Sequence, residues 1–137
     1  MAKLYIIRGI PGSGKSTYAE TLKKDLWEDG HDVARFEADD YWMKDGKYCI
    51  DLKNLHAAHK WCFDKVFNAF DKGCDIVIVS NTFTRLSEME PYINKAMERN
   101  IDITVYRMGN EFKKVHNVPE EVIKKKKNRF EDYDNEI

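Results

Sequence analysis

No stretch of this sequence is apolar for long enough to cross a membrane. A membrane-spanning helix needs about 18 or more apolar residues in a row, and no run of this chain approaches that length. The chain also does not begin with a charged segment, an apolar segment and a small-residue cleavage site, so we expect no secretory signal. These absences predict a soluble protein of the cytoplasm without a membrane role.

Cysteine is scarce, and its spacing excludes a disulfide framework. The three cysteines, Cys49, Cys62 and Cys74, are an odd number without paired spacing, as expected in a reducing compartment. His56, His59 and Cys62 recur at helical spacing, which could indicate metal ligation. A structural zinc site needs four ligands, however, and no fourth residue has matching spacing. We therefore predict no structural zinc.

The chain has no excess of charge of either sign. Lysine and arginine number 23 against 24 acidic residues, which gives a formal net charge of −1. A near-neutral protein exerts no overall attraction on nucleic acid. Positive charge is concentrated near the C-terminus, at Lys113, Lys114, residues 124–127 and Arg129. Such a run is usually a solvated helix face, and contact with phosphate is the alternative.

Apolar runs alternate with helical periodicities along the 137 residues. This length suits one domain, residues 1–137, and the alternation is typical of a parallel sheet covered by helices. We therefore predict a three-layer α/β fold with four to five parallel strands and with ligands at the carboxyl ends of the strands. The expected strands are 3–8, 32–37, 76–79 and 101–107, and the expected helices are 15–28, 52–72, 86–99 and one beginning at Pro119.

A phosphate-binding loop lies between the first strand and the first helix. The pattern Gly9-x-x-x-x-Gly14-Lys15-Ser16 matches the Walker A motif, and it follows an expected strand and opens an expected helix, as that motif requires. The predicted α/β fold is therefore of the P-loop NTPase type. Its glycines let successive backbone amides point at phosphate oxygens, and the helix N-terminus adds attraction. Lys15 would bind the β and γ phosphates and Ser16 would bind Mg²⁺. We expect ATP or another nucleoside triphosphate to contact Gly9, Gly12, Ser13, Gly14, Lys15, Ser16 and Thr17.

An acidic pair, Asp39-Asp40, follows the second predicted strand at the same edge of the sheet. A phosphotransferase needs a carboxylate that accepts the proton of the attacking hydroxyl. The position of the pair favours this catalytic role, and a solvated acidic turn is the alternative.

Five segments resemble a family of small P-loop kinases and AAA-type ATPases. These are GIPGSGKSTYA at 9–19, EADDYW at 37–42, AHKWC at 58–62, SNT at 80–82 and HNVPEEVI at 116–123. The family includes the kinase domain of phage polynucleotide kinase, zeta-toxin-like kinases and Nedd-binding-protein-like ATPases. The resemblance implies that Asp39 is the general base, that Asp40 supports it, and that Mg²⁺ and ATP are the cofactors.

The chain departs from that family at three places. Trp42 stands where polynucleotide kinase has an arginine that grips a nucleic-acid phosphate, so this side chain either stacks on a base or packs. Asn81 stands where a carboxylate is often found. The region that supplies lid arginines in the family has lysines instead. We therefore regard Asp40, Trp42, Asn81, Lys113, Lys114 and Arg129 as candidate acceptor or lid residues.

Three functions fit these observations. The first is a polynucleotide-kinase-like enzyme that moves the γ-phosphate of ATP to a hydroxyl of a nucleic-acid 5′ end, a nucleoside or nucleotide, or a related small molecule. The second is a nucleotide-binding module or slow NTPase that regulates a partner without a phosphoryl acceptor. The third, a nucleic-acid-binding module acting through the C-terminal lysines, is disfavoured by the near-neutral charge.

Overall fold

A four-stranded parallel sheet forms the centre of the molecule. The computed structural model describes residues 2–44, 47–48, 55–108 and 133. Within them the strands pair in the order β2-β5-β1-β6, so β1 and β5 are the inner strands. The structure confirms the predicted class of fold. The strands are β1 (Lys3–Arg8), β2 (Val33–Phe36), β5 (Ile76–Asn81) and β6 (Asp102–Arg107).

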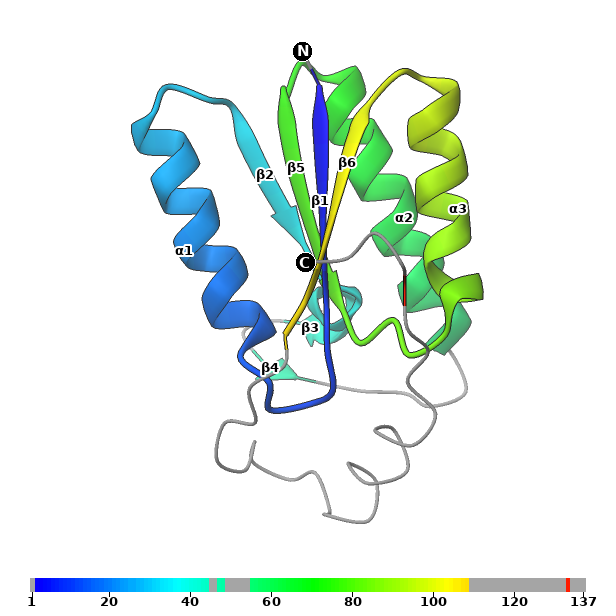
Figure 1. The fold of residues 1–137 in the computed structure, drawn as a ribbon. Helices are drawn as coiled ribbons and strands as arrows, with labels where there is room; N and C mark the ends of the chain where they lie inside the picture. The colour runs from blue at the N-terminus through cyan, green and yellow to red at the C-terminus, as the bar shows by residue number, and fades with distance from the viewer. Residues whose placement is uncertain (1, 45–46, 49–54, 109–132, 134–137) are drawn as a thin grey trace.

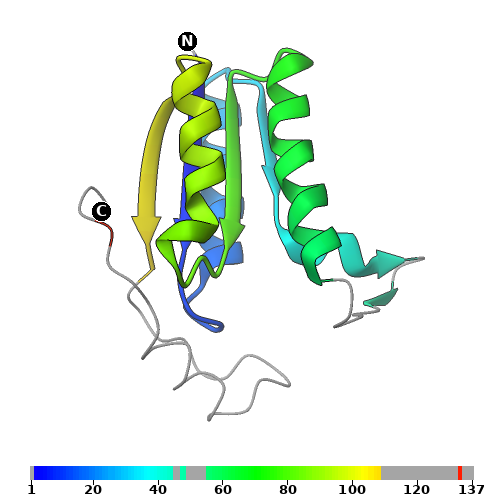
Figure 2. The same ribbon diagram turned by 90° about the vertical axis from the view of Figure 1, so that its right-hand side faces the viewer.

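Helices cover both faces of the sheet, as the strand-helix alternation predicts. Figures 1 and 2 show one helix, α1 (Lys15–Glu28), on one face, and α2 (Leu55–Asp71) and α3 (Leu86–Glu98) on the other. The helix expected from Pro119 lies outside the described residues. Among the helices that the structure describes, none combines the length and apolarity needed to span a membrane.

Side chains alternate between two apolar layers along each strand. On β1, Leu4 and Ile6 belong to the larger core formed with α2 and α3, whereas Ile7 packs with Ala19 of α1. This period of two is a geometric property of extended backbone. The position of a residue along its strand therefore decides which helical layer it meets.

A short helical turn and a small hairpin connect β2 to α2. The turn is η1 (Ala38–Trp42), and the hairpin pairs β3 (Met43–Lys44) with β4 (Lys47–Tyr48) in antiparallel fashion. The sequence did not predict this hairpin, because strands of two residues are too short to show a periodicity. All four strands of the main sheet end at one edge, where the β1–α1 loop and η1 also lie (Figure 1).

Candidate functional site

The loop between β1 and α1 has the backbone that its glycines predict. Gly12 and Gly14 adopt φ angles of 84° and 87°, a left-handed region that other residues resist. A Cβ atom at Gly9 would lie only 2.5 Å from Ser13 Oγ, so the close approach of backbone to side chain requires glycine there. The Ser13 side chain is accordingly buried within the loop.

The start of α1 is available to an anion. No side chain of the described residues caps this end of the helix, and its first turn carries no acidic residue. The first amides of a helix have no partner within the helix itself, and they attract negative charge. Lys15 Nζ lies over the same loop, where it donates a hydrogen bond to the Ile10 carbonyl at 3.1 Å. Ser16 and Thr17 are exposed beside it.

A carboxylate that we did not assign from the sequence lies next to this loop. Glu37 Oε1 accepts hydrogen bonds from Ser16 Oγ at 2.5 Å, Ser80 Oγ at 2.8 Å and Arg35 Nη2 at 2.8 Å. Arg35 also forms an ion pair with Glu20 of α1 at 3.2 Å. The side chain of Glu37 is only 15% exposed. These contacts tie the start of α1 to the ends of β2 and β5.

Strand geometry explains why these side chains meet. Ile78 packs toward α1, so Ser80, two residues further along β5, faces the same layer. Phe36 of β2 pairs with Val79 of β5. The residues that follow them, Glu37 and Ser80, are therefore neighbours. The alternation of side chains along β2 and β5 places Glu37 and Ser80 on the face toward α1. Predicting their contact also requires the register between the two strands, which the sequence does not reveal.

Asn81 faces the opposite layer from Ser80. Its Oδ1 accepts a hydrogen bond from the Ala38 backbone N–H at 2.8 Å, and its Nδ2 lies 3.7 Å from Cys62 Sγ on α2. It is therefore Ser80, and not Asn81, that lies beside Ser16. Asn81 instead fixes the first residue of η1 against the end of β5.

The two aspartates of η1 have different surroundings. Asp40 is half-buried, and its Oδ2 accepts a hydrogen bond from the Glu37 backbone N–H at 3.0 Å. Burial is the main cause that raises the pKa of Asp40. Asp39 is exposed on the same turn. The hydrogen bond of Asp40 therefore stabilises the turn that also carries Asp39.

Trp42 belongs to the core. It is 3% exposed, and its ring lies 5.1 Å from that of Tyr41, which in turn lies 5.8 Å from the ring of Trp61. Of the two alternatives for Trp42, the structure shows packing. The other candidate lid residues, Lys113, Lys114 and Arg129, lie outside the described residues.

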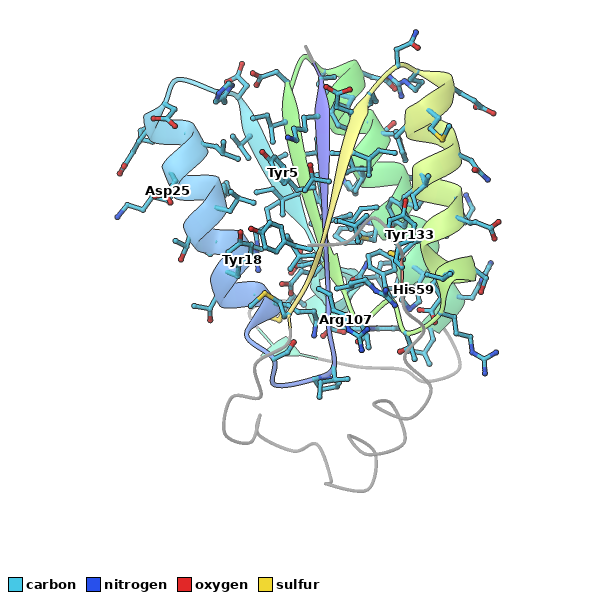
Figure 3. All side chains as sticks on the ribbon, in the orientation of Figure 1. Tyr5, Tyr18, Asp25, His59, Arg107 and Tyr133 are labelled. Carbon is cyan, nitrogen blue, oxygen red and sulfur yellow. The ribbon has the colours of Figure 1, made fainter. Side chains whose placement is uncertain are left out.

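A half-buried tyrosine packs α1 against the sheet close to the loop. Figure 3 shows Tyr18 between α1 and the sheet, where its ring lies 5.1 Å from that of Tyr106. Burial, followed by the hydrogen bond with Tyr106, raises the pKa of Tyr18 to about 12. The tyrosine is therefore neutral at physiological pH. Its packing holds the first turns of α1, and with them Ser16, against the sheet.

The oxygen atoms around Glu37 suit a hard cation. Within the described part of the chain, no three His, Cys, Asp or Glu side chains gather in a way that could hold a metal ion. Ser16, Ser80 and Glu37 nevertheless bring two hydroxyls and one carboxylate together. Mg²⁺ prefers oxygen ligands and retains several waters, so it needs few protein groups. The residues present therefore fit a magnesium ion bound together with nucleotide phosphates.

The comparison with protein families identifies the chain. The family model of the chromatin-associated protein KTI12 matches residues 1–136. The chain belongs to the KTI12 family. A relative, human NEDD4-binding protein 2, is 39% identical over 90 residues. These 90 residues are 66% of this chain and 5% of the human protein. The predicted resemblance to Nedd-binding-protein-like proteins is confirmed.

Solved structures of kinases share the fold of this KTI12-family chain. A chain of the Pnkp1/Rnl/Hen1 RNA repair complex matches with a TM-score of 0.73 and 20% identity, over 94% of this chain and 44% of that one. Mycobacterium tuberculosis APS kinase in complex with AMPPNP and APS matches with a TM-score of 0.60 and 15% identity, over 78% of this chain and 62% of the kinase. At these identities the matches show a common P-loop kinase-like fold.

Proposed function

We propose that this protein is an ATP-dependent kinase that transfers the γ-phosphoryl group to a hydroxyl acceptor. The observation that carries the proposal is the junction of the phosphate loop with the acidic turn. Ser16 lies 2.5 Å from Glu37, and Asp39 follows Glu37 by two residues. A glycine loop with a carboxylate beside its serine suits any P-loop NTPase, whereas a second carboxylate that is exposed on the adjoining turn, as Asp39 is, suits a phosphotransferase.

The donor half of the site would bind Mg²⁺ and ATP. The amides of the loop and Lys15 would bind the phosphates, and Ser16 would offer its hydroxyl to the metal ion. When bound, Mg²⁺ neutralises charge on the β and γ phosphates. The fold shared with an APS kinase that was solved with AMPPNP supports ATP as the donor.

The transfer step requires one proton acceptor. The hydroxyl oxygen of the substrate forms a bond to the γ phosphorus of ATP. The bond from this phosphorus to the β–γ bridging oxygen breaks, and ADP leaves. We assign the proton of the acceptor hydroxyl to the carboxylate of Asp39. Lys113, Lys114 and Arg129 remain predicted sources of positive charge for the transferring group, and lysine would supply charge without the bidentate geometry of arginine.

A nucleic-acid 5′ end and a small molecule are both candidate acceptors. The likeness to a chain of an RNA repair complex supports the first, and the likeness to APS kinase supports the second. The burial of Trp42 removes one surface on which a base could have stacked. A regulatory nucleotide-binding role remains the second candidate, because the family is described as chromatin-associated. We retain the cytoplasm as the predicted compartment for the kinase.

The deciding experiment follows radioactive γ-phosphate from ATP into a panel of 5′-hydroxyl oligonucleotides, nucleosides, nucleotides and small metabolites. We expect the label to appear in an acceptor. The rate of phosphoryl transfer should be at least about 100-fold lower in Lys15→Ala, because this variant lacks the positive charge that would stabilise the transferring phosphoryl group. Lys24→Ala is the matched control, since Lys24 is exposed on the same helix. ATP binding with label released only into water, or not at all, would instead support the regulatory module.

A further inference from the structure

We propose that Glu37 is the carboxylate that positions the metal-binding hydroxyl of Ser16, and that β2 supplies this group in place of β5. The inference rests on the proposed binding of Mg²⁺ and nucleotide. P-loop NTPases commonly pair the loop serine or threonine with an aspartate at the end of a neighbouring strand. Here β5 ends in Ser80 and Asn81, so no carboxylate is available at that place.

Hydrogen-bond directions support the assignment. The Ser16 hydroxyl donates its proton to Glu37 Oε1 at 2.5 Å, so the lone pairs of the serine oxygen can face a cation. The Ser80 hydroxyl donates to the same carboxylate oxygen at 2.8 Å. Glu37 therefore orients two hydroxyls at once. Partners of this kind fix the geometry of metal ligands and tune the affinity for the metal.

The charge of the cluster also suits a cation. Arg35 Nη2 lies 2.8 Å from Glu37 Oε1, and Arg35 Nη1 lies 3.2 Å from Glu20 Oε2. Two carboxylates share one guanidinium, which leaves a single negative charge beside Ser16. Glu37 and Arg35 are both mostly buried, whereas Glu20 is 63% exposed, so the carboxylate of Glu37 is the member of the cluster whose charge is least screened by solvent.

Manganese binding tests the role of Glu37 without requiring any turnover. Mn²⁺ takes the place of Mg²⁺, and its affinity for the ADP complex is measured by electron paramagnetic resonance. We expect Glu37→Gln to weaken Mn²⁺ binding by about 10-fold to 100-fold. The affinity for ADP in EDTA should not change, because the phosphate loop is intact. Glutamine keeps a carbonyl oxygen for the three donors, so the variant should fold, but it lacks the negative charge that strengthens the hydrogen bond from Ser16 and attracts the cation.

Two further variants make the test specific. Glu20→Gln removes the other carboxylate that pairs with Arg35; because Glu20 is 63% exposed and its charge is screened by solvent, this variant should weaken Mn²⁺ binding less than Glu37→Gln does. The double substitution Glu37→Ser with Ser80→Asp moves the carboxylate from β2 to β5. Since the two side chains meet at 2.8 Å, this exchange should restore most of the lost affinity, and restoration would show that a carboxylate near Ser16 is what matters.

An unchanged Mn²⁺ affinity in Glu37→Gln, or an equal loss in Glu20→Gln, overturns the proposal. The result of the Mn²⁺ titrations does not depend on the result of the kinase assay. If no acceptor is ever labelled, the proposed transfer fails while the Mn²⁺ titrations still decide the role of Glu37. If transfer occurs and Mn²⁺ affinity does not depend on Glu37, the inference about Glu37 alone is wrong.

Discussion

At the scale of single residues, two adjacent aspartates in one turn have different surroundings. Asp40 is half-buried and accepts a hydrogen bond from the backbone of Glu37 at 3.0 Å. Asp39 is exposed on the same turn. An exposed carboxylate can meet an acceptor hydroxyl, whereas one bonded to its own backbone stabilises a turn. The role of Asp39 as the base stays a prediction.

Replacement of Asp39 should separate transfer from binding. We expect Asp39→Asn to lower the rate of phosphoryl transfer by about 10² to 10⁴, because the amide cannot accept the proton. The affinity for ATP, measured by calorimetry, should stay within about threefold. Asp40→Asn is the matched control, since its amide oxygen can still accept the Glu37 N–H. Equal losses in both variants, or loss of ATP binding in Asp39→Asn, would mean that Asp39 is not the base.

At the scale of elements, the position of η1 depends on the end of β5. The Asn81 side chain accepts the Ala38 N–H at 2.8 Å, and both residues are buried. A buried amide left without an acceptor costs about 1 to 3 kcal/mol. The turn that carries Asp39 is therefore held by one hydrogen bond from a neighbouring strand, in addition to the packing of Trp42.

Truncation of Asn81 should loosen this turn. We expect Asn81→Ala to lower the free energy of unfolding by about 1 to 3 kcal/mol and to lower kcat more than the affinity for ATP. Urea unfolding and steady-state kinetics measure the two effects. Asn68→Ala makes the same chemical change on the exposed face of α2 and should alter neither. A loss confined to ATP affinity would show that Asn81 serves the phosphate loop instead.

The sequence predicts those elements whose signals are local. Each main strand is a short segment rich in apolar side chains, and the phosphate loop is a contiguous motif, so both were found within one or two residues of their observed bounds. The contact between Glu37 and Ser80 was not predicted, because it depends on the register of two strands that are far apart in the chain. The hairpin of β3 and β4 escaped prediction because its strands have two residues each.

At the scale of the whole molecule, the two faces of the sheet carry different groups of side chains. The face toward α1 carries Ser16, Glu37 and Ser80. The opposite face holds the larger apolar core and a buried arginine, Arg8, at the end of the inner strand β1. Arg8 reaches the connection between β5 and α3, which it holds through backbone carbonyls. On this face a charged side chain therefore ties β1 to the β5–α3 connection, in addition to the apolar core.

Loss of Arg8 should lower the stability of the entire described fold. Its Nε and Nη2 donate to the Phe83 carbonyl at 3.1 Å and 2.8 Å, where Phe83 has a positive φ of 47°. We expect Arg8→Met to reduce the free energy of unfolding by about 2 to 3 kcal/mol, since a buried carbonyl loses a charged donor.

Urea unfolding followed by tryptophan fluorescence and by far-ultraviolet circular dichroism gives the measurement. Both probes should shift together, because the strand that carries Arg8 lies inside the sheet and links both helical layers. Arg99→Met breaks a pair with the exposed Asp71 and should cost less than about 1 kcal/mol. If Arg8→Met gains stability, the desolvation of the buried guanidinium outweighs its hydrogen bonds. If both variants lose the same stability, the buried hydrogen bonds of Arg8 contribute no more than the surface pair of Arg99.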